Sequence, residues 1–272
     1  MSADPTPPEP TVGPLRLLAE ALAAGVLVNG LLLAAGVPEL AVFSVLAITL
    51  VLTGRMGQVL AANRSAIWGD RERPRAANGR TALSILAIFV GVGLAFGGVA
   101  WWTAPADVGV VFGELLADAV AGDAVDRRFD AGMGDLLARN FATLGVLWLV
   151  GFFVGPPGVL LAIGWNAAIW TASIAGLAAD ASPAGAAPSV GAIVGTTAAL
   201  APHLLLELVA YVLAAMSAIF DSRALSRYHS GDARRWQVFR SVVRLLGVAA
   251  ALVVAAAVLE DSVAPLLLDR LR

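Results

Sequence analysis

The chain has 272 residues, of which 59% are hydrophobic and 14% are charged, and its mean hydropathy is +0.82. Its apolar residues form unbroken blocks of about twenty, which indicates an integral membrane protein and excludes a membrane β-barrel, whose strands alternate over about ten residues. Because every backbone polar group in lipid needs an internal partner, we expect an all-α, polytopic bundle of transmembrane helices.

The residue types that the chain lacks exclude several kinds of chemistry. It contains no cysteine, so disulfides, thiolate catalysis and cysteine-bound metals are ruled out. All 18 basic residues are arginine, so no phosphate-binding loop can end in lysine, and an ATPase that works with this chain would be a separate polypeptide. The net charge is −2, and we expect no nucleic-acid partner.

The predicted elements start with a tail and a helical hairpin. Residues 1–14 carry Pro, Ser, Thr and acidic side chains without an apolar face, which predicts a disordered tail. Two apolar spans follow at about 15–36 and 40–60, and the Gly- and Pro-containing stretch between them predicts a tight turn. We therefore expect an N-terminal transmembrane hairpin over residues 15–60.

An arginine-rich segment separates this hairpin from the remaining spans. Residues 61–80 predict a cytoplasmic basic loop, with Arg64, Arg71, Arg73, Arg75 and Arg80. A third span at about 81–102 ends in paired tryptophans, which are typical of the membrane interface. From residue 81 to residue 265 we expect one membrane domain.

Residues 104–139 differ from the spans around them, because acidic side chains alternate there with apolar ones at spacings of three and four. This pattern predicts an extracytoplasmic segment of one or two amphipathic helices, lying on the membrane surface or packed on the bundle. A solvated helical loop is the alternative.

Two later stretches are too long for one perpendicular crossing of a hydrocarbon core of roughly 30 Å. Residues 141–177 would extend roughly 55 Å as one helix, so the Gly155-Pro156-Pro157-Gly158 sequence predicts a turn between spans of about 15 and 20 residues. Residues 190–220 would extend about 46 Å. They form either one tilted span kinked at Pro202 or a span preceded by a re-entrant half-helix at 190–201.

A second arginine-rich loop and a last span at about 242–259 complete seven spans. This count places 13 of the 18 arginines on or near one side of the membrane. Positive charge marks the cytoplasmic side, so we expect a multi-pass protein of the cell membrane with a cytoplasmic N-terminus and an extracytoplasmic C-terminus.

The sixth span contains Pro202, His203 and Glu207, and an ionisable side chain at membrane depth costs several kcal/mol. His203 and Glu207 are four residues apart and so share one helix face. Asn166 is a further polar group near the middle of the fifth span. These residues predict a polar intramembrane site that binds a proton, an ion or a partner segment. Alternatively, His203, Glu207 and Asn166 satisfy one another and fix the helix register.

Catalysis finds little support in the sequence. It has no Gly-x-Ser-x-Gly element, and a His–Glu pair with no second histidine or cysteine nearby does not complete a zinc site. We expect no enzyme activity, no catalytic residue, no metal and no cofactor.

Two pairs of glycines are spaced for close helix approach, Gly93 with Gly97 and Gly151 with Gly155. We expect them to pack inside the bundle, and a homodimer interface is the alternative.

Several of these motifs, taken in order, resemble the stage II sporulation protein M family. They are Arg139-Asn140 opening a span, the glycines from Gly151 to Gly158, Gly164-Trp165-Asn166, and Ala201-Pro202-His203 followed by Glu207. The resemblance covers about residues 81–259. The chain has Ala167 and Leu204 where the family pattern has glycine, and it adds the hairpin of residues 15–60.

The resemblance implies a polytopic membrane protein whose matching positions are Asn140, Asn166, Pro202, His203 and Glu207. The resemblance also implies that, in spore-forming organisms, such a protein is a scaffold that localises cell-wall hydrolases. We therefore expect a non-enzymatic membrane scaffold or assembly factor that contacts membrane lipids and other membrane or extracytoplasmic proteins. The alternative is a transport component, either a permease subunit with a separate ATPase or a proton-coupled carrier that uses His203 and Glu207.

Overall fold

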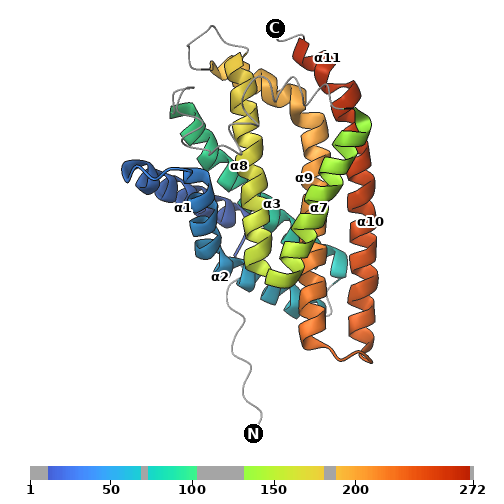
Figure 1. The fold of residues 1–272 in the computed structure, drawn as a ribbon. Coiled ribbons are helices and arrows are strands. Elements are labelled where there is room, and N and C mark those ends of the chain that lie inside the picture. Colours follow the sequence, from blue (N-terminus) through green and yellow to red (C-terminus); the bar gives the residue numbers. More distant parts are fainter. Residues whose placement is uncertain (1–11, 69–72, 103–131, 181–187, 270–272) are drawn as a thin grey trace.

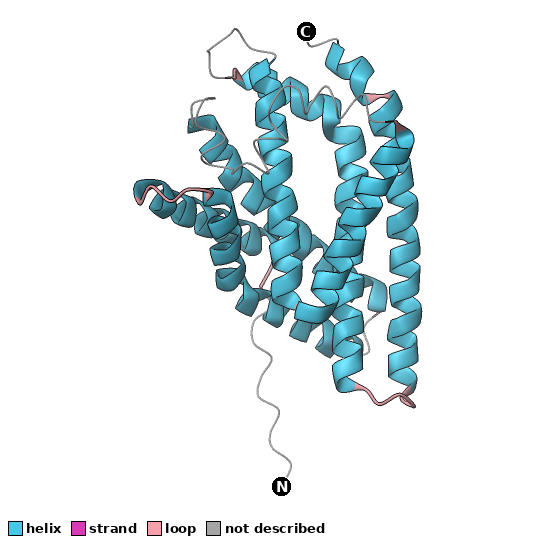
Figure 2. Ribbon diagram, in the orientation of Figure 1, coloured by secondary structure: helices cyan, strands magenta, loops and turns pink. Residues whose placement is uncertain are grey.

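The chain folds into a bundle of α-helices, and the computed structural model describes residues 12–68, 73–102, 132–180 and 188–269 (Figure 1). No strand occurs within these residues (Figure 2). The helices are α1 (Pro14–Ala34), α2 (Leu40–Trp68), α3 (Pro74–Trp102), α7 (Met133–Val154), α8 (Pro156–Asp180), α9 (Val190–Arg227), α10 (Ala233–Ser262) and α11 (Ala264–Asp269). All except α11 are long and apolar enough to cross a membrane, which confirms the predicted all-helical class.

Several helices extend beyond the apolar runs that predicted them. Within the predicted basic loop of residues 61–80, α2 continues to Trp68 and α3 already begins at Pro74. The fourth span was predicted to be short, but α7 begins at Met133 and has 22 residues. Hydropathy marks the part of a helix that lies in lipid, whereas its backbone hydrogen bonds continue through exposed polar turns. The predicted tail (1–14) and acidic segment (104–139) fall largely outside the described residues.

The predicted turn between the fourth and fifth spans is present at Gly155. This residue has φ of +74°, a conformation that favours glycine, and α8 begins at Pro156, where a missing backbone N–H costs no helical hydrogen bond. A Cβ on Gly151 would lie 2.6 Å from Val159 Cγ2 and 2.8 Å from Ala218 Cβ, so this glycine lets α7 approach α8 and α9 closely. Gly151 therefore packs inside the bundle, as expected.

Helix α9 is continuous over 38 residues and contains Pro202, so residues 190–201 belong to one long span. Its first part runs across the bundle before the remainder descends beside α10 (Figure 1). A proline inside a helix removes one hydrogen bond and bends the axis. A helix of 38 residues with a bend at Pro202 need not cross the membrane as one straight rod. Ser189 caps the helix by accepting a hydrogen bond from the Ala192 N–H at 3.1 Å.

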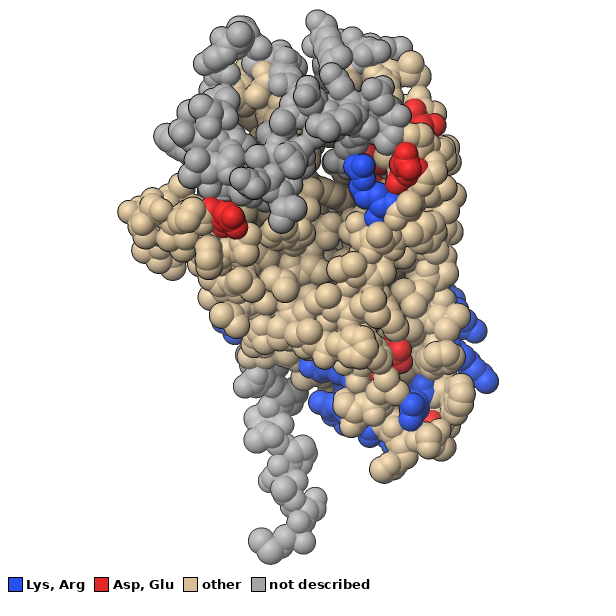
Figure 3. Space-filling view, in the orientation of Figure 1, with Lys and Arg blue, Asp and Glu red and all other residues tan. Residues whose placement is uncertain are grey.

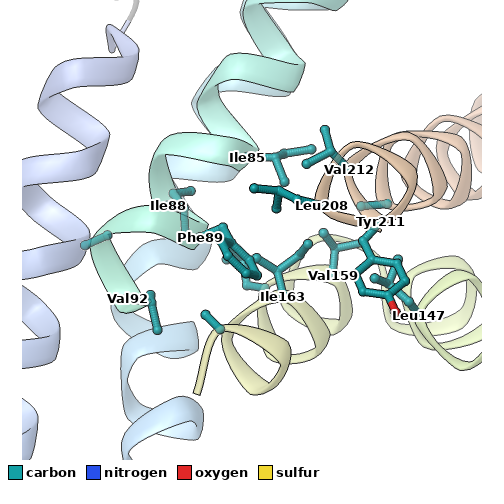
Figure 4. Packing of buried hydrophobic residues seen from close by; sticks show 14 of the residues in the cluster. Ile85, Ile88, Phe89, Val92, Leu147, Val159, Ile163, Leu208, Tyr211 and Val212 are labelled. Carbon is teal, nitrogen blue, oxygen red and sulfur yellow. The ribbon is translucent and has the colours of Figure 1, made fainter. Parts of the chain in front are cut away.

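The apolar core includes residues of all seven long helices, and Figure 4 shows the part of it where α3, α7, α8 and α9 meet. Phe89 of α3 packs edge-on against Trp170 of α8, with ring centroids 5.1 Å apart. Leu147 of α7 and Tyr211 of α9 close the cluster from the other side. Large apolar side chains such as Leu50 and Phe153 point outward, with exposed fractions of 76% and 77%, as expected for surfaces that face lipid.

Helix α1 depends on two glycines for its contact with α3. A Cβ on Gly91 would lie 2.6 Å from the Leu18 carbonyl oxygen and 2.8 Å from Ala21 Cβ. A Cβ on Gly25 would clash with Ala95. The two helices therefore approach almost to backbone contact. Their packing depends on van der Waals contacts between backbones and small side chains.

We predict that Gly91→Ala destabilises the protein by about 1–3 kcal/mol, because the added methyl group must push α1 away from α3. Gly98→Ala on the same helix is the control, since a Cβ there meets nothing within 4 Å. Thermal unfolding in detergent should show a lower melting temperature for the first variant alone. Equal melting temperatures would contradict the close packing of α1 on α3.

Candidate functional site

The central polar contact of the bundle joins α7 to α9. The Asn140 side-chain amide donates a hydrogen bond to Glu207 Oε1 at 2.7 Å. Asn140 is 5% exposed and Glu207 is 1% exposed, so the contact is closed to solvent and to lipid. A carboxylate oxygen inside a membrane protein needs such a donor, because the hydrocarbon around the bundle offers none.

The inward face of α9 carries the polar side chains of this site. Thr196, His203 and Glu207 are spaced by seven and four residues, so they share one helix face, and all three are at most 2% exposed. Pro202, by contrast, is exposed and lies beside this face. One turn beyond Glu207, Tyr211 enters the apolar core. The sequence-predicted His203 and Glu207 are thus sheltered by neighbouring helices.

Asn166 has a different partner from the one that its position predicts. Its side-chain amide donates to the Ala162 carbonyl oxygen of its own helix at 2.8 Å. Asn166 thus bonds within its own helix, and Asn140 is the amide that contacts Glu207.

Sequence reasoning missed the polar contacts of the N-terminal hairpin. Ser44 of α2 donates a hydrogen bond to Asn29 Oδ1 of α1, and both residues are buried. Near the start of α1, Glu20 pairs with Arg16 and with Arg55 of α2, each at 2.9 Å. The signal was present, because Asn29 and Glu20 each interrupt an apolar run.

A second buried carboxylate, Glu260, lies near the end of α10 and is 2% exposed. The sequence placed it at the edge of the last span and predicted no role for it. Its position two residues before the end of α10 offered no periodicity to distinguish it from a solvated residue.

Basic side chains gather at the end of the bundle where α9 connects to α10 (Figure 3). Asp232 caps α10 there by accepting a hydrogen bond from the Arg234 N–H at 2.8 Å. The Arg234 side chain also donates to this carboxylate at 2.7 Å, and these hydrogen bonds lower the pKa of Asp232. One arginine of this end is therefore neutralised within the chain.

Seven long apolar helices with a closed polar contact between two of them define a multi-pass helical membrane protein. The sequence also matches the model of the family described as stage II sporulation protein M (SpoIIM) over residues 85–265. The chain belongs to the SpoIIM family, which confirms the resemblance drawn from its motifs. No curated protein and no solved structure matches it.

We predict that Asn140→Ala destabilises the protein by about 1–3 kcal/mol, because a buried carboxylate oxygen loses its donor. In a double-mutant cycle with Glu207→Ala, the coupling energy should be about 0.5–2 kcal/mol. Thr143→Ala is the control, since Thr143 bonds only the Arg139 carbonyl of its own helix. Reversible unfolding in mixed micelles measures all four variants, and a coupling near zero would refute the contact.

Proposed function

We propose that this SpoIIM-family protein is a non-enzymatic membrane scaffold or assembly factor. The observation that supports the proposal is the closed contact between Asn140 and Glu207, made at 2.7 Å by side chains that are at most 5% exposed. The polar groups at the centre of the bundle hold helices in place.

This arrangement favours a scaffold over a transporter for a geometric reason. A carrier or a catalytic site must admit a substrate, or at least water, to its ionisable groups. His203 and Glu207 are 2% and 1% exposed, so neither is open to the solvent in this conformation. The alternative, a transport component, requires a second conformation in which this contact opens.

The outer connections of the bundle are the natural places for partner recruitment. The acidic segment of residues 104–139 lies mainly outside the described residues, and its sequence combines acidic with apolar side chains. Extracytoplasmic or membrane proteins with basic, partly apolar surfaces would complement it. A separate ATPase among the partners would instead favour the transport alternative.

To test recruitment, we would replace residues 104–131 with a Gly/Ser linker of equal length. The replacement stops before Met133 because α7 begins there and Leu136 is buried. We expect proteins cross-linked from the extracytoplasmic side to be lost. A matched replacement of residues 181–187 is the control and should retain them, and identical partners for both variants would contradict the proposed role of the acidic segment.

The transport alternative is tested with the same protein in liposomes that contain a trapped pH-sensitive dye. A scaffold should add no proton flux to that of protein-free liposomes under an imposed membrane potential. Proton flux that His203→Ala or Glu207→Gln abolishes, in variants that melt like the parent protein, would overturn the scaffold proposal.

We also propose that the arginine-rich end of the bundle faces the cytoplasm, on the basis of its charge. The chain has no cysteine, so single Ser→Cys variants label without background. Ser230→Cys, between α9 and α10, should react with a membrane-impermeant maleimide only after the cells are permeabilised. Ser262→Cys, at the end of α10, should react in intact cells, and the opposite pattern would reverse the topology.

A further inference from the structure

A cavity of about 160 Å³ lies between the ends of α2, α3, α9 and α10. Three arginines line it, Arg64 from α2 with Arg223 and Arg227 from α9. Like charges repel one another, so three guanidinium groups around one small space favour an anion between them.

Among the described residues, these arginines differ from Arg16, Arg55 and Arg234 in having no acidic partner. Arg16 and Arg55 pair with Glu20, and Arg234 pairs with Asp232. Within the part of the chain that the structure describes, no carboxylate lies within ion-pair distance of Arg64, Arg223 or Arg227. Among the described residues, therefore, no carboxylate neutralises the positive charge of the cavity, which favours an anionic ligand.

The remaining lining of the cavity combines hydrogen-bonding and apolar groups. Asn63 and Asn78 are joined by a hydrogen bond of 3.0 Å, which ties α2 to α3 beside the arginines. Leu60, Ile67 and Phe220 supply apolar walls. A ligand that matches this lining carries a phosphate group for the guanidinium groups and an apolar part for the walls.

Aromatic residues place the cavity at the level of the membrane interface. Trp236 and Phe239 of α10 are 56% and 45% exposed, and they flank the lining residues Gln237 and Val238 in the sequence. Exposed tryptophan at a helix end is typical of the lipid headgroup region. The phosphates of lipids in the adjacent leaflet therefore lie at the height of the three arginines.

We infer that this cavity binds the phosphate group of an anionic phospholipid, with Arg64, Arg223 and Arg227 as its ligands. Basic pockets between transmembrane helices bind lipid headgroups in this way. The inference concerns a specific lipid site and does not depend on the scaffold role.

The test uses the full-length protein in a neutral detergent, titrated with dioctanoyl phosphatidylglycerol or dioctanoyl phosphatidylcholine. Phosphatidylglycerol should raise the melting temperature more than phosphatidylcholine does. Arg223→Gln should weaken the apparent affinity of the protein for phosphatidylglycerol by about tenfold, the loss expected for one charge-assisted phosphate contact. Arg240→Gln is the control, because it removes the same charge from an exposed position of α10 that does not line the cavity. The affinity of this variant for phosphatidylglycerol should match that of the parent protein.

Three results would overturn the inference. If phosphatidylglycerol and phosphatidylcholine raise the melting temperature equally, the protein does not select for the net negative charge of the lipid. An equal loss in Arg223→Gln and Arg240→Gln would indicate diffuse attraction to a basic surface. Glycerol 3-phosphate that binds as tightly as the lipid, and depends equally on Arg223, would identify a soluble phosphate compound. If Arg223→Gln does not fold, Arg64→Gln replaces it, because Arg64 is exposed and its loss leaves α9 intact.

Discussion

The main polar constraint on the centre of the bundle is the hydrogen bond from the Asn140 amide of α7 to the Glu207 carboxylate of α9, at 2.7 Å. Apolar packing between helices in a membrane is tolerant of sliding, because lipid chains are as apolar as the side chains that would be exposed. A buried carboxylate reduces this tolerance, since a shift of one helical turn would separate Glu207 from the Asn140 amide. The core around Leu147 and Tyr211 therefore forms in a single register.

Hydropathy predicted the existence of the spans but not their ends. The thickness of the hydrocarbon core sets the length of an apolar run, so seven spans could be counted from the sequence. It does not determine where helical hydrogen bonding stops. The turns at Met133–Arg139 and at Arg223–Arg227 are helical although they carry the charged side chains of Asp135, Arg139, Arg223 and Arg227. Gly155 was predictable because few other residues tolerate the conformation that its turn requires.

The partners within the site were harder to predict than its members. His203 and Glu207 were visible as ionisable groups in an apolar run, and their spacing placed them on one face. Asn140 lies 67 positions from Glu207 in the sequence, and only the family resemblance singled it out. Asn166 shows the limit of such reasoning, because an intramembrane amide can bond a carbonyl of its own helix and need no neighbour. Spacing along one helix carries no information about which other helix it meets.

The bundle treats charge in opposite ways at its centre and at its arginine-rich end. At the centre, Glu207 has an amide donor and almost no exposed surface, which suits a fixed structural element. At the end, Arg64, Arg223 and Arg227 line an open space and lack acidic partners among the described residues. Among the described residues, the arginine-lined space therefore lies at the rim of the bundle, whereas the Glu207 contact at its centre is closed.

The polar contacts of α1 have a consequence for biosynthesis. Ser44 and Asn29 bond each other, and Glu20 pairs with Arg55, so both contacts join α1 only to α2. The contact of α1 with α3, in contrast, is made by the close approach at Gly25 and Gly91. Because α1 and α2 precede α3 in the chain, they can satisfy each other's polar groups in the bilayer before α3 is synthesised, and α3 can then dock on α1 through close packing alone.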